Sequence, residues 1–210
     1  MGTLCMIIGE SGSGKSTSLR NFEPDEVGIF NVAGKPLPFR KRLPSADNCT
    51  YKTIKSSLAK NALRAYVVDD STYLMQFDMF KHAKETGYGK FTDMALEFEE
   101  LLRAAMSTSP DTVVYFLHHP QFADDGRMKP QTVGKMLDNQ LNVEGLFPIV
   151  IECKVEDGKH VFTTNNEGIA KSPMGMLEPT MDNDLKAVDT AIREYWQLAP
   201  LSTKPAAPAK

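Results

Sequence analysis

Nine consecutive residues near the N-terminus have the types and spacing needed to hold a phosphate chain. They match the pattern G-x-x-x-x-G-K-[ST], in which successive backbone N–H groups face the phosphates and a following helix N-terminus adds a positive dipole end. We expect Lys15 to neutralise the β- and γ-phosphates and the Ser16 hydroxyl to coordinate Mg²⁺. The alternative is a plain glycine- and serine-rich turn. The predicted nucleotide-binding residues are Gly9, Glu10, Ser11, Gly12, Ser13, Gly14, Lys15, Ser16 and Thr17.

Two acids follow an apolar run in the middle of the chain. Residues 64–71 carry Asp69 and Asp70 at the end of a predicted buried strand. In ATPases with a phosphate-binding loop, an acid at such a strand tip faces the phosphates. We predict that Asp69 holds the Mg²⁺ hydration shell and that Asp70 polarises an attacking water. A strand that simply stops at two turn-forming aspartates is the alternative.

Two histidines end the next apolar run, residues 111–117. A polar side chain at this strand tip is placed to sense the γ-phosphate, so His118 or His119 is a candidate sensor, and we assign His119 to the catalytic set. A plain polar end to the strand is the alternative. A zinc site is disfavoured because adjacent residues on a strand point to opposite sides.

The elements that must position these residues alternate between strands and helices. The expected strands are residues 4–8, 27–32, 64–71 and 111–117, with an antiparallel hairpin over 147–155 and 160–164 around the turn Asp157-Gly158. The expected helices are residues 16–22, 55–63, 72–84, 93–106, 132–141 and 182–197. Residues 33–46 and 121–131 are predicted loops, the second a partner-binding one. We expect one α/β domain over residues 1–198 and a disordered tail over 199–210.

Charge and cysteine usage limit the possible partners. The net charge is −3, but seven cations stand against one acid between Lys35 and Lys60, a local charge of +6 and a candidate phosphate-backbone surface. A solvated basic loop explains the charge equally well. Cys5, Cys49 and Cys153 are typical of reduced core thiols. With no apolar run of membrane-spanning length and no room for a signal peptide, we expect a soluble cytoplasmic protein.

Taken together, these residues resemble the RecA-like ATPases, and within them the short phage nucleotide-binding proteins related to single-strand annealing ATPases. The resemblance rests on Gly9–Thr17, Val67–Asp70, Val113–His119, the Asp157-Gly158 hairpin and Ala170-Lys171. It implies a mainly parallel sheet with helices on both faces and a C-terminal antiparallel hairpin. It also implies ATP and Mg²⁺ between neighbouring subunits, assembly into a ring or filament, and binding of single-stranded DNA through loops such as the one after His119.

The chain departs from this family at two places. RecA-like enzymes usually carry a water-activating glutamate after the second strand, whereas residues 31–35 here contain no acid. Related hexameric helicases have a lysine and, two residues on, an arginine that reach the neighbour's γ-phosphate. Lys171 matches the lysine, with a surface lysine as the alternative, but Pro173 occupies the place of the arginine. Hydrolysis is therefore expected to be slow or to rely on Asp70.

The main prediction is an ATP-binding and ATP-hydrolysing homo-oligomer that acts on single-stranded DNA in phage-type recombination or replication, in the host cell cytoplasm. One alternative is a kinase for a nucleoside or small metabolite, which the scarcity of late arginines disfavours, since only Arg193 lies beyond Arg127. The other is an assembly protein that binds ATP with little turnover. A small GTPase is disfavoured because no Asn-Lys-x-Asp motif occurs.

Overall fold

The computed structural model describes residues 1–87, 89–134, 141–166 and 168–201. Its strands are β1 (Thr3–Ile8), β2 (Gly28–Asn31), β3 (Ser45–Asp47), β4 (Ala65–Asp69), β5 (Val113–His118), β6 (Pro120–Phe122), β7 (Met128–Pro130), β8 (Ile149–Glu156), β9 (Lys159–Thr163) and β10 (Thr180–Asp182). Its helices are α1 (Tyr51–Lys60), α2 (Thr72–Lys81), α3 (Gly89–Met106), α5 (Leu185–Trp196) and the short 3₁₀ helices η1 (Ser16–Asn21) and η2 (Glu144–Leu146).

In the described part of the chain, eight strands form one sheet in the order β10-β9-β8-β1-β5-β4-β2-β3. The pairs from β8 through β3 are parallel, whereas β8–β9 and β9–β10 are antiparallel. The expected α/β fold with a mainly parallel sheet and a C-terminal antiparallel hairpin is therefore confirmed. Asp157 and Gly158 turn that hairpin with φ of +49° and +75°, which suits the predicted type I′ turn.

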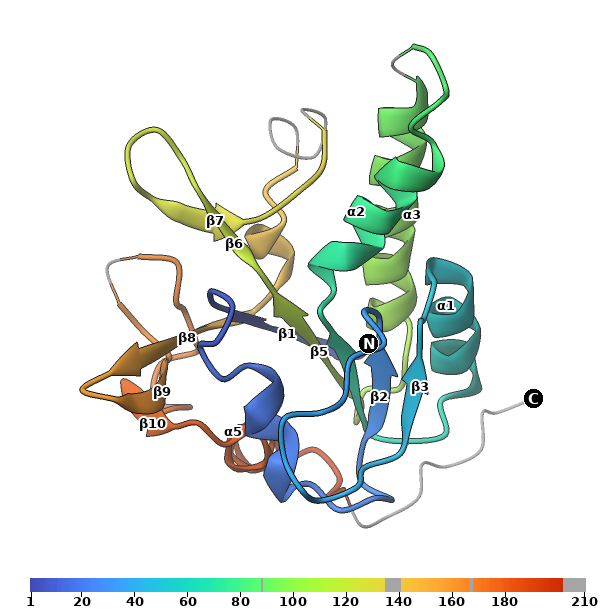
Figure 1. Ribbon diagram of the computed structural model, residues 1–210. Coiled ribbons are helices and arrows are strands. Elements are labelled where there is room, and N and C mark those ends of the chain that lie inside the picture. Colours follow the sequence, from blue (N-terminus) through green and yellow to red (C-terminus); the bar gives the residue numbers. More distant parts are fainter. Residues whose placement is uncertain (88, 135–140, 167, 202–210) are drawn as a thin grey trace.

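Alternation along the strands divides the core into two layers (Figure 1). Side chains such as Met6, Val68 and Phe116 point to the face that α1, α2 and α3 cover. Their neighbours along the strands point to the opposite face, which η1 and α5 cover. Strands buried on both faces read as continuous apolar runs, which is why β1, β4 and β5 could be predicted from the sequence.

Several expected elements differ in form. The predicted helix over 16–22 is the single 3₁₀ segment η1. The helix predicted from residue 55 begins at Tyr51, because Thr50 forms a capping box with Thr53 that satisfies the first backbone N–H groups. Strands β3 and β10, which we did not predict, extend the two edges of the sheet.

The segment predicted as a loop over 121–131 is instead largely an antiparallel hairpin. Strands β6 and β7 pair through Phe122–Met128 and Pro120–Pro130, and the hairpin projects away from the main sheet (Figure 1). Of the helix predicted over 132–141, residues 135–140 lie outside the described residues, and the described flanks are not helical.

The first residues of the expected tail are not free of the domain. The Ala199 N–H donates to the Asp111 carboxylate at 2.9 Å, and the carbonyl oxygen of Pro200 accepts from Arg64 at 3.3 Å. Residues 202–210 lie outside the described residues.

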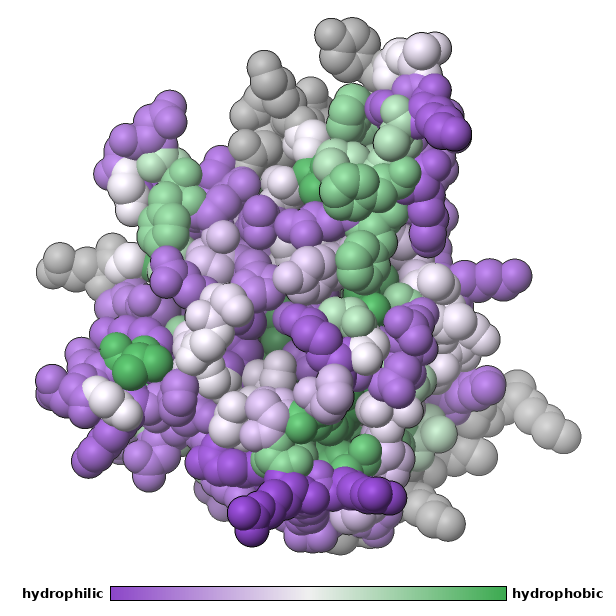
Figure 2. Space-filling view, in the orientation of Figure 1, coloured by the Kyte–Doolittle hydropathy of each residue, from purple (hydrophilic) through white to green (hydrophobic). Residues whose placement is uncertain are grey.

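The surface carries an apolar area over α2 and α3 (Figure 2). Phe77 and Phe80 of α2 and Leu96 of α3 are exposed there. Among the residues that the structure describes, no helix combines the length and the apolar character needed to cross a membrane.

Candidate nucleotide site

The predicted phosphate-binding loop joins the carboxyl end of β1 to η1. Lys15 folds back across the loop, and its ammonium group donates to the carbonyl oxygens of Gly9 at 2.6 Å and Glu10 at 2.9 Å. Burial lowers the pKa of Lys15, an effect that the Asp69 and Asp70 carboxylates partly offset. The lysine is thus held at the mouth of the loop by carbonyl oxygens, which a phosphate oxygen could replace as acceptors.

Residues that we did not assign to the site hold this loop in place by donating hydrogen bonds to its carbonyl oxygens. His160 of β9 donates from Nδ1 to the Ser13 carbonyl oxygen at 2.8 Å, and the thiol of Cys153 donates to the same oxygen at 3.2 Å. Asn183 donates to the Gly14 carbonyl oxygen at 3.2 Å. A Cβ on Gly9 would lie 2.2 Å from the Cys153 carbonyl oxygen, so only glycine fits at the first position of the motif.

Ser16 and Asp69 form the contact expected of a Mg²⁺ site. The Ser16 hydroxyl donates to Asp69 Oδ1 at 2.8 Å and joins η1 to the end of β4. Asp69 is only 5% exposed, and burial raises the pKa of its carboxyl to about 6 against the opposing hydrogen bond from Ser16. Lys15 and Lys35 attract this carboxylate only in part, since burial still dominates its pKa, and a divalent cation would compensate its charge more fully.

Asp70 faces the same cavity, but it is already paired. Its backbone adopts a left-handed conformation with φ of +59°, which is uncommon for a residue other than glycine and turns the chain into α2. Lys35 Nζ lies 2.6 Å from Asp70 Oδ2, and His119 Nε2 lies 3.3 Å from Asp70 Oδ1. Burial raises the pKa of Asp70, but His119 and Lys35 outweigh burial and hold that pKa below its usual value. Asp70 is therefore a poor proton acceptor in this state.

Lys35, which we did not assign to the site, comes from the segment after β2. Because β2 pairs with β4 so that Asn31 lies beside Asp69, the residues after Asn31 pass over the acids. The Asn31 side chain donates to the Lys35 carbonyl oxygen at 2.7 Å and to Asp47 Oδ1 at 2.9 Å, which fixes this segment.

The two histidines have separate roles. His118 is fully buried, with Nδ1 2.8 Å from Ser71 Oγ and Nε2 2.9 Å from the Gln131 carbonyl oxygen. Burial lowers the pKa of His118 to about 4, so it is a neutral core residue. His119 points to the other side, to Asp70 and the edge of the Tyr73 ring. Of the two candidates, the structure places His119 at the cavity.

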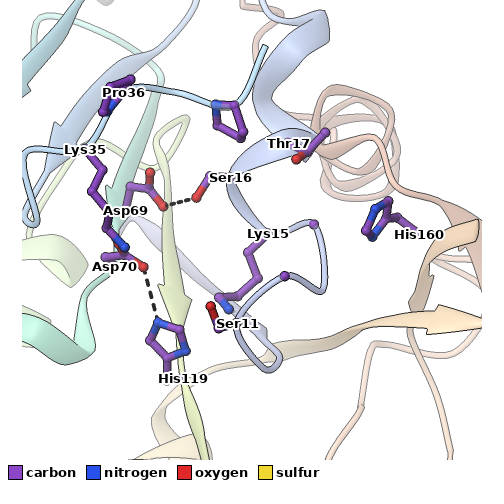
Figure 3. A pocket seen from close by; sticks show the side chains of 13 residues that line it. Ser11, Lys15, Ser16, Thr17, Lys35, Pro36, Asp69, Asp70, His119 and His160 are labelled. Carbon is purple, nitrogen blue, oxygen red and sulfur yellow. Dashed lines mark hydrogen bonds and ion pairs between the residues drawn. The ribbon is translucent and has the colours of Figure 1, made fainter.

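These groups line one cavity of about 290 Å³ (Figure 3). The lining residues are Ser11, Gly12, Gly14, Lys15, Ser16, Thr17, Lys35, Pro36, Pro38, Asp69, Asp70, His119 and His160. Figure 3 shows Asp69, Asp70, Lys35 and His119 at one end, and Thr17 and His160 at the other. Lys15 and Ser16 lie between these two ends, and Ser16 reaches Asp69 through its hydrogen bond.

The available donors suit Mg²⁺ better than a fully protein-held metal. Among the described residues there is no group of three or more His, Cys, Asp and Glu side chains that could hold an ion. Ser16 and Asp69 offer two oxygen donors, and Mg²⁺ commonly binds one or two protein oxygens together with phosphates and waters.

Lys171 is not among the residues that line the cavity. Its backbone N–H and carbonyl oxygen both pair with Val150, each at 2.8 Å. Within one chain the structure therefore does not bring Lys171 to the phosphate-binding loop.

The basic segment is also divided. Lys35 pairs with Asp70, Lys41 with Glu23, and Lys55 with Glu97 and Glu100. Acids therefore balance part of the charge of three of the seven cations in this segment.

The fold and the cavity together show an α/β protein in which a strand, a glycine-rich loop and a helix follow one another, with an acid-ended strand beside the loop. The sequence matches no model of a known protein family, and no curated protein is significantly similar to it.

Proposed function

We propose that this chain is a RecA-like protein that binds ATP with Mg²⁺ and hydrolyses it slowly. In this proposal it is a homo-oligomer in the host cytoplasm and acts on single-stranded DNA in phage-type recombination or replication. The observation that carries the nucleotide part is the 2.8 Å hydrogen bond from Ser16 to Asp69 beside Lys15. It joins two motifs that are 53 residues apart in the sequence, and a chance glycine-rich turn would not produce it.

Each group in the cavity has a use in this proposal. Backbone N–H groups of residues 9–17 and Lys15 bind the phosphates, and Ser16 with Asp69 holds Mg²⁺, which would draw charge from the terminal phosphates. His119 contacts the terminal phosphate from the tip of β5. Asp70 orients the attacking water once its present partners release it.

The expectation of slow turnover is supported by the state of Asp70. Both of its carboxylate oxygens face cations or potential cations, Lys35 at 2.6 Å and His119 at 3.3 Å. No acid replaces the glutamate that RecA-like enzymes carry after the second strand, because this segment presents Lys35. The same observation favours a second candidate, an assembly protein for which ATP is mainly a structural ligand. A kinase is less well supported, since Arg193 is buried against Asp189 and cannot serve in a lid.

Aromatic side chains near His119 support the DNA part. A hollow of about 270 Å³ lies beside the phosphate loop, with Tyr73, Gln76 and Phe122 in its lining. Phe122 is 55% exposed, and Tyr73 continues through a stacked contact to the exposed Phe77. Exposed aromatic rings next to amide groups suit the stacking of unpaired bases.

The test combines binding, turnover and assembly. Fluorescent ATP is titrated with Mg²⁺ into the wild-type protein and into Lys15→Ala, with Lys41→Met as a charge-matched control from outside the cavity. We expect Lys15→Ala to weaken binding by about tenfold or more, the effect of losing a charge-assisted phosphate contact. Lys41→Met should bind as the wild type does.

Phosphate release and particle size are then measured with and without single-stranded DNA. Release stimulated by DNA supports the ATPase, whereas nucleotide-dependent assembly without phosphate release supports the assembly protein. Absence of nucleotide binding by the wild-type protein would overturn the proposal.

A further inference from the structure

We propose that Lys35 is a second phosphate-binding lysine of this site. Its ammonium group dissociates from Asp70 and binds the terminal phosphate of a bound nucleoside triphosphate. This inference rests on the proposed nucleotide binding and adds to it a residue that distinguishes triphosphate from diphosphate. It also assigns Asp70 two states, paired with Lys35 in the free protein and released when a triphosphate is bound.

The position of Lys35 carries the first step. Lys35 and Pro36 line the same cavity as Lys15 and Ser16. In Figure 3 the Lys35 side chain runs from the Pro36 segment down to Asp70, at the end of the cavity where Asp69 and His119 also lie. That is the end at which the Mg²⁺ ligands gather, so the terminal rather than the first phosphate is within its reach.

The anchoring of Lys35 carries the second step. Its backbone is fixed by the hydrogen bond from Asn31, and the side chain begins from a defined point four residues beyond the end of β2. The side chain itself is 60% exposed, with the ammonium group 5.2 Å from the centre of the Tyr73 ring. A fixed backbone with a solvated, flexible four-carbon stem allows the ammonium group to change partners without moving the loop.

Competition between anions carries the third step. Lys35 and Asp70 form an ion pair whose two ends differ in exposure, because the Lys35 side chain is 60% exposed and the Asp70 side chain is 11% exposed. Water therefore competes for the ammonium group, and holding the long lysine side chain in one geometry costs side-chain entropy, so the ammonium group can exchange this partner for another anion. A terminal phosphate offers several charged acceptor oxygens in a cavity whose other cation, Lys15, lies deeper in the loop. The phosphate therefore outcompetes Asp70 for Lys35.

The consequence falls on Asp70. Without Lys35, the carboxylate keeps His119 and gains a free oxygen that can accept a hydrogen bond from water. Binding of the terminal phosphate is thus coupled to release of Asp70. Among the described residues that line the cavity, Asp70 is the one acid besides Asp69 that could orient water.

The experiment compares two ligands on four proteins by calorimetry with Mg²⁺ present. The ligands are ADP and a non-hydrolysable ATP analogue, and the proteins are wild type, Lys35→Met, Lys35→Arg and the control Lys41→Met. Lys41 belongs to the same basic segment but pairs with Glu23 and does not line the cavity. Thermal unfolding of each variant establishes that it is folded.

We expect Lys35→Met to weaken the triphosphate analogue by about tenfold while ADP changes by less than about twofold. Lys35→Arg should keep most of the discrimination because it keeps the charge, and Lys41→Met should match the wild type for both ligands.

An independent variant tests the exchange of partners. Asp70→Asn removes the anion that holds Lys35, so it should tighten the triphosphate analogue more than ADP, and the double variant Asp70→Asn/Lys35→Met should lose that gain. Equal effects of Lys35→Met on both ligands, or no effect on either, would overturn the role of Lys35 while leaving nucleotide binding intact. A wild-type protein that binds neither ligand would instead overturn the proposed function.

Discussion

Arg193 of α5 lies at the centre of a buried polar network and is not among the residues that line the cavity. It donates to Asp189 from Nε at 2.5 Å and from Nη2 at 3.2 Å, and the Tyr115 hydroxyl donates to the same carboxylate at 2.7 Å. The other guanidinium hydrogen bonds go to the carbonyl oxygens of Arg64 at 2.8 Å, Asp111 at 2.9 Å and Ala199 at 2.8 Å. The network therefore ties α5 to the residues before β4 and β5.

Replacing Arg193 by methionine should leave a buried carboxylate without its cation. Asp189 is fully buried, and burial raises the pKa of its carboxyl even with Arg193 in place. The folded variant can avoid the buried charge by keeping the carboxyl protonated. At pH 7 that costs about 4 kcal/mol, because the unfolded chain ionises with a pKa of about 3.9. This value lies within the range of about 3–5 kcal/mol for breaking a buried ion pair.

The sign of the pH dependence follows from the raised pKa. An acid whose pKa is raised on folding binds more protons in the folded state, so its contribution to stability is lost as pH rises. The penalty of Arg193→Met should therefore shrink on acidification, to about 1.5 kcal/mol at pH 5 by the same calculation. In thermal unfolding at pH 7, the expected loss corresponds to a fall in Tm of about 6 to 20 °C.

Urea unfolding at pH 7 and pH 5 measures these differences in the free energy of unfolding. Asp189→Asn in the Arg193→Met background removes the uncompensated charge and should recover about 1–3 kcal/mol at pH 7. Arg103→Met is the matched control, because Arg103 forms an exposed pair with Glu99 and should change stability by less than about 1 kcal/mol. A penalty for Arg193→Met that is equal at both pH values and is not relieved by Asp189→Asn would refute the reasoning.

Two further predictions concern the histidine beneath the site and the hairpin beside it. Burial lowers the pKa of His118 to about 4, so its contribution to stability is fully present above its ordinary pKa and is lost as pH falls. In urea unfolding, the difference in unfolding free energy between wild type and His118→Asn should therefore shrink by about 2 kcal/mol from pH 7 to pH 5. The comparison with the variant is needed because the raised pKa of Asp69 acts in the opposite direction, and an advantage that does not change with pH would contradict a buried neutral His118. At Gly158, with φ of +75° and no atom within 4 Å of an added Cβ, Gly158→Ala should cost about 1–2 kcal/mol of unfolding free energy through backbone strain alone, and a neutral result in urea would count against the left-handed turn.

Features that depend on consecutive residues could be predicted from the sequence. An apolar run followed by polar residues of defined type predicted two of these features. They are strand β1 with the loop after it, and strand β4 with Asp69 and Asp70. The other core strands and helices that we predicted were found in the same way, from the spacing of apolar residues along the sequence. The short hairpin of β6 and β7 could not be found in this way, because three-residue strands carry too few alternating positions and both contain proline.

Contacts that depend on strand order could not be predicted. Lys35 belonged to a run of cations that suggested a phosphate-backbone surface, and nothing local indicates that it pairs with Asp70. His160 looked like any polar residue of a hairpin, yet the pairing of β9 with β8 brings it to the Ser13 carbonyl oxygen. One signal could have identified Lys35. It stands only four residues after the end of β2, the strand that pairs with the acid-bearing strand β4.

That position explains why the charge of one side chain matters so much for the proposed chemistry. Because β2 lies beside β4 in the sheet, the segment that follows β2 passes over the end of β4, and its fourth residue, Lys35, lies against Asp70. A carboxylate there would repel both Asp70 and the phosphates and would instead attract water. A lysine attracts both anions, so it can bind only one of them fully at a time. In the proposed site, the presence of a lysine rather than an acid at position 35 therefore makes Asp70 and the terminal phosphate compete for the same ammonium group. Asp70 is released from Lys35 only after the triphosphate has bound.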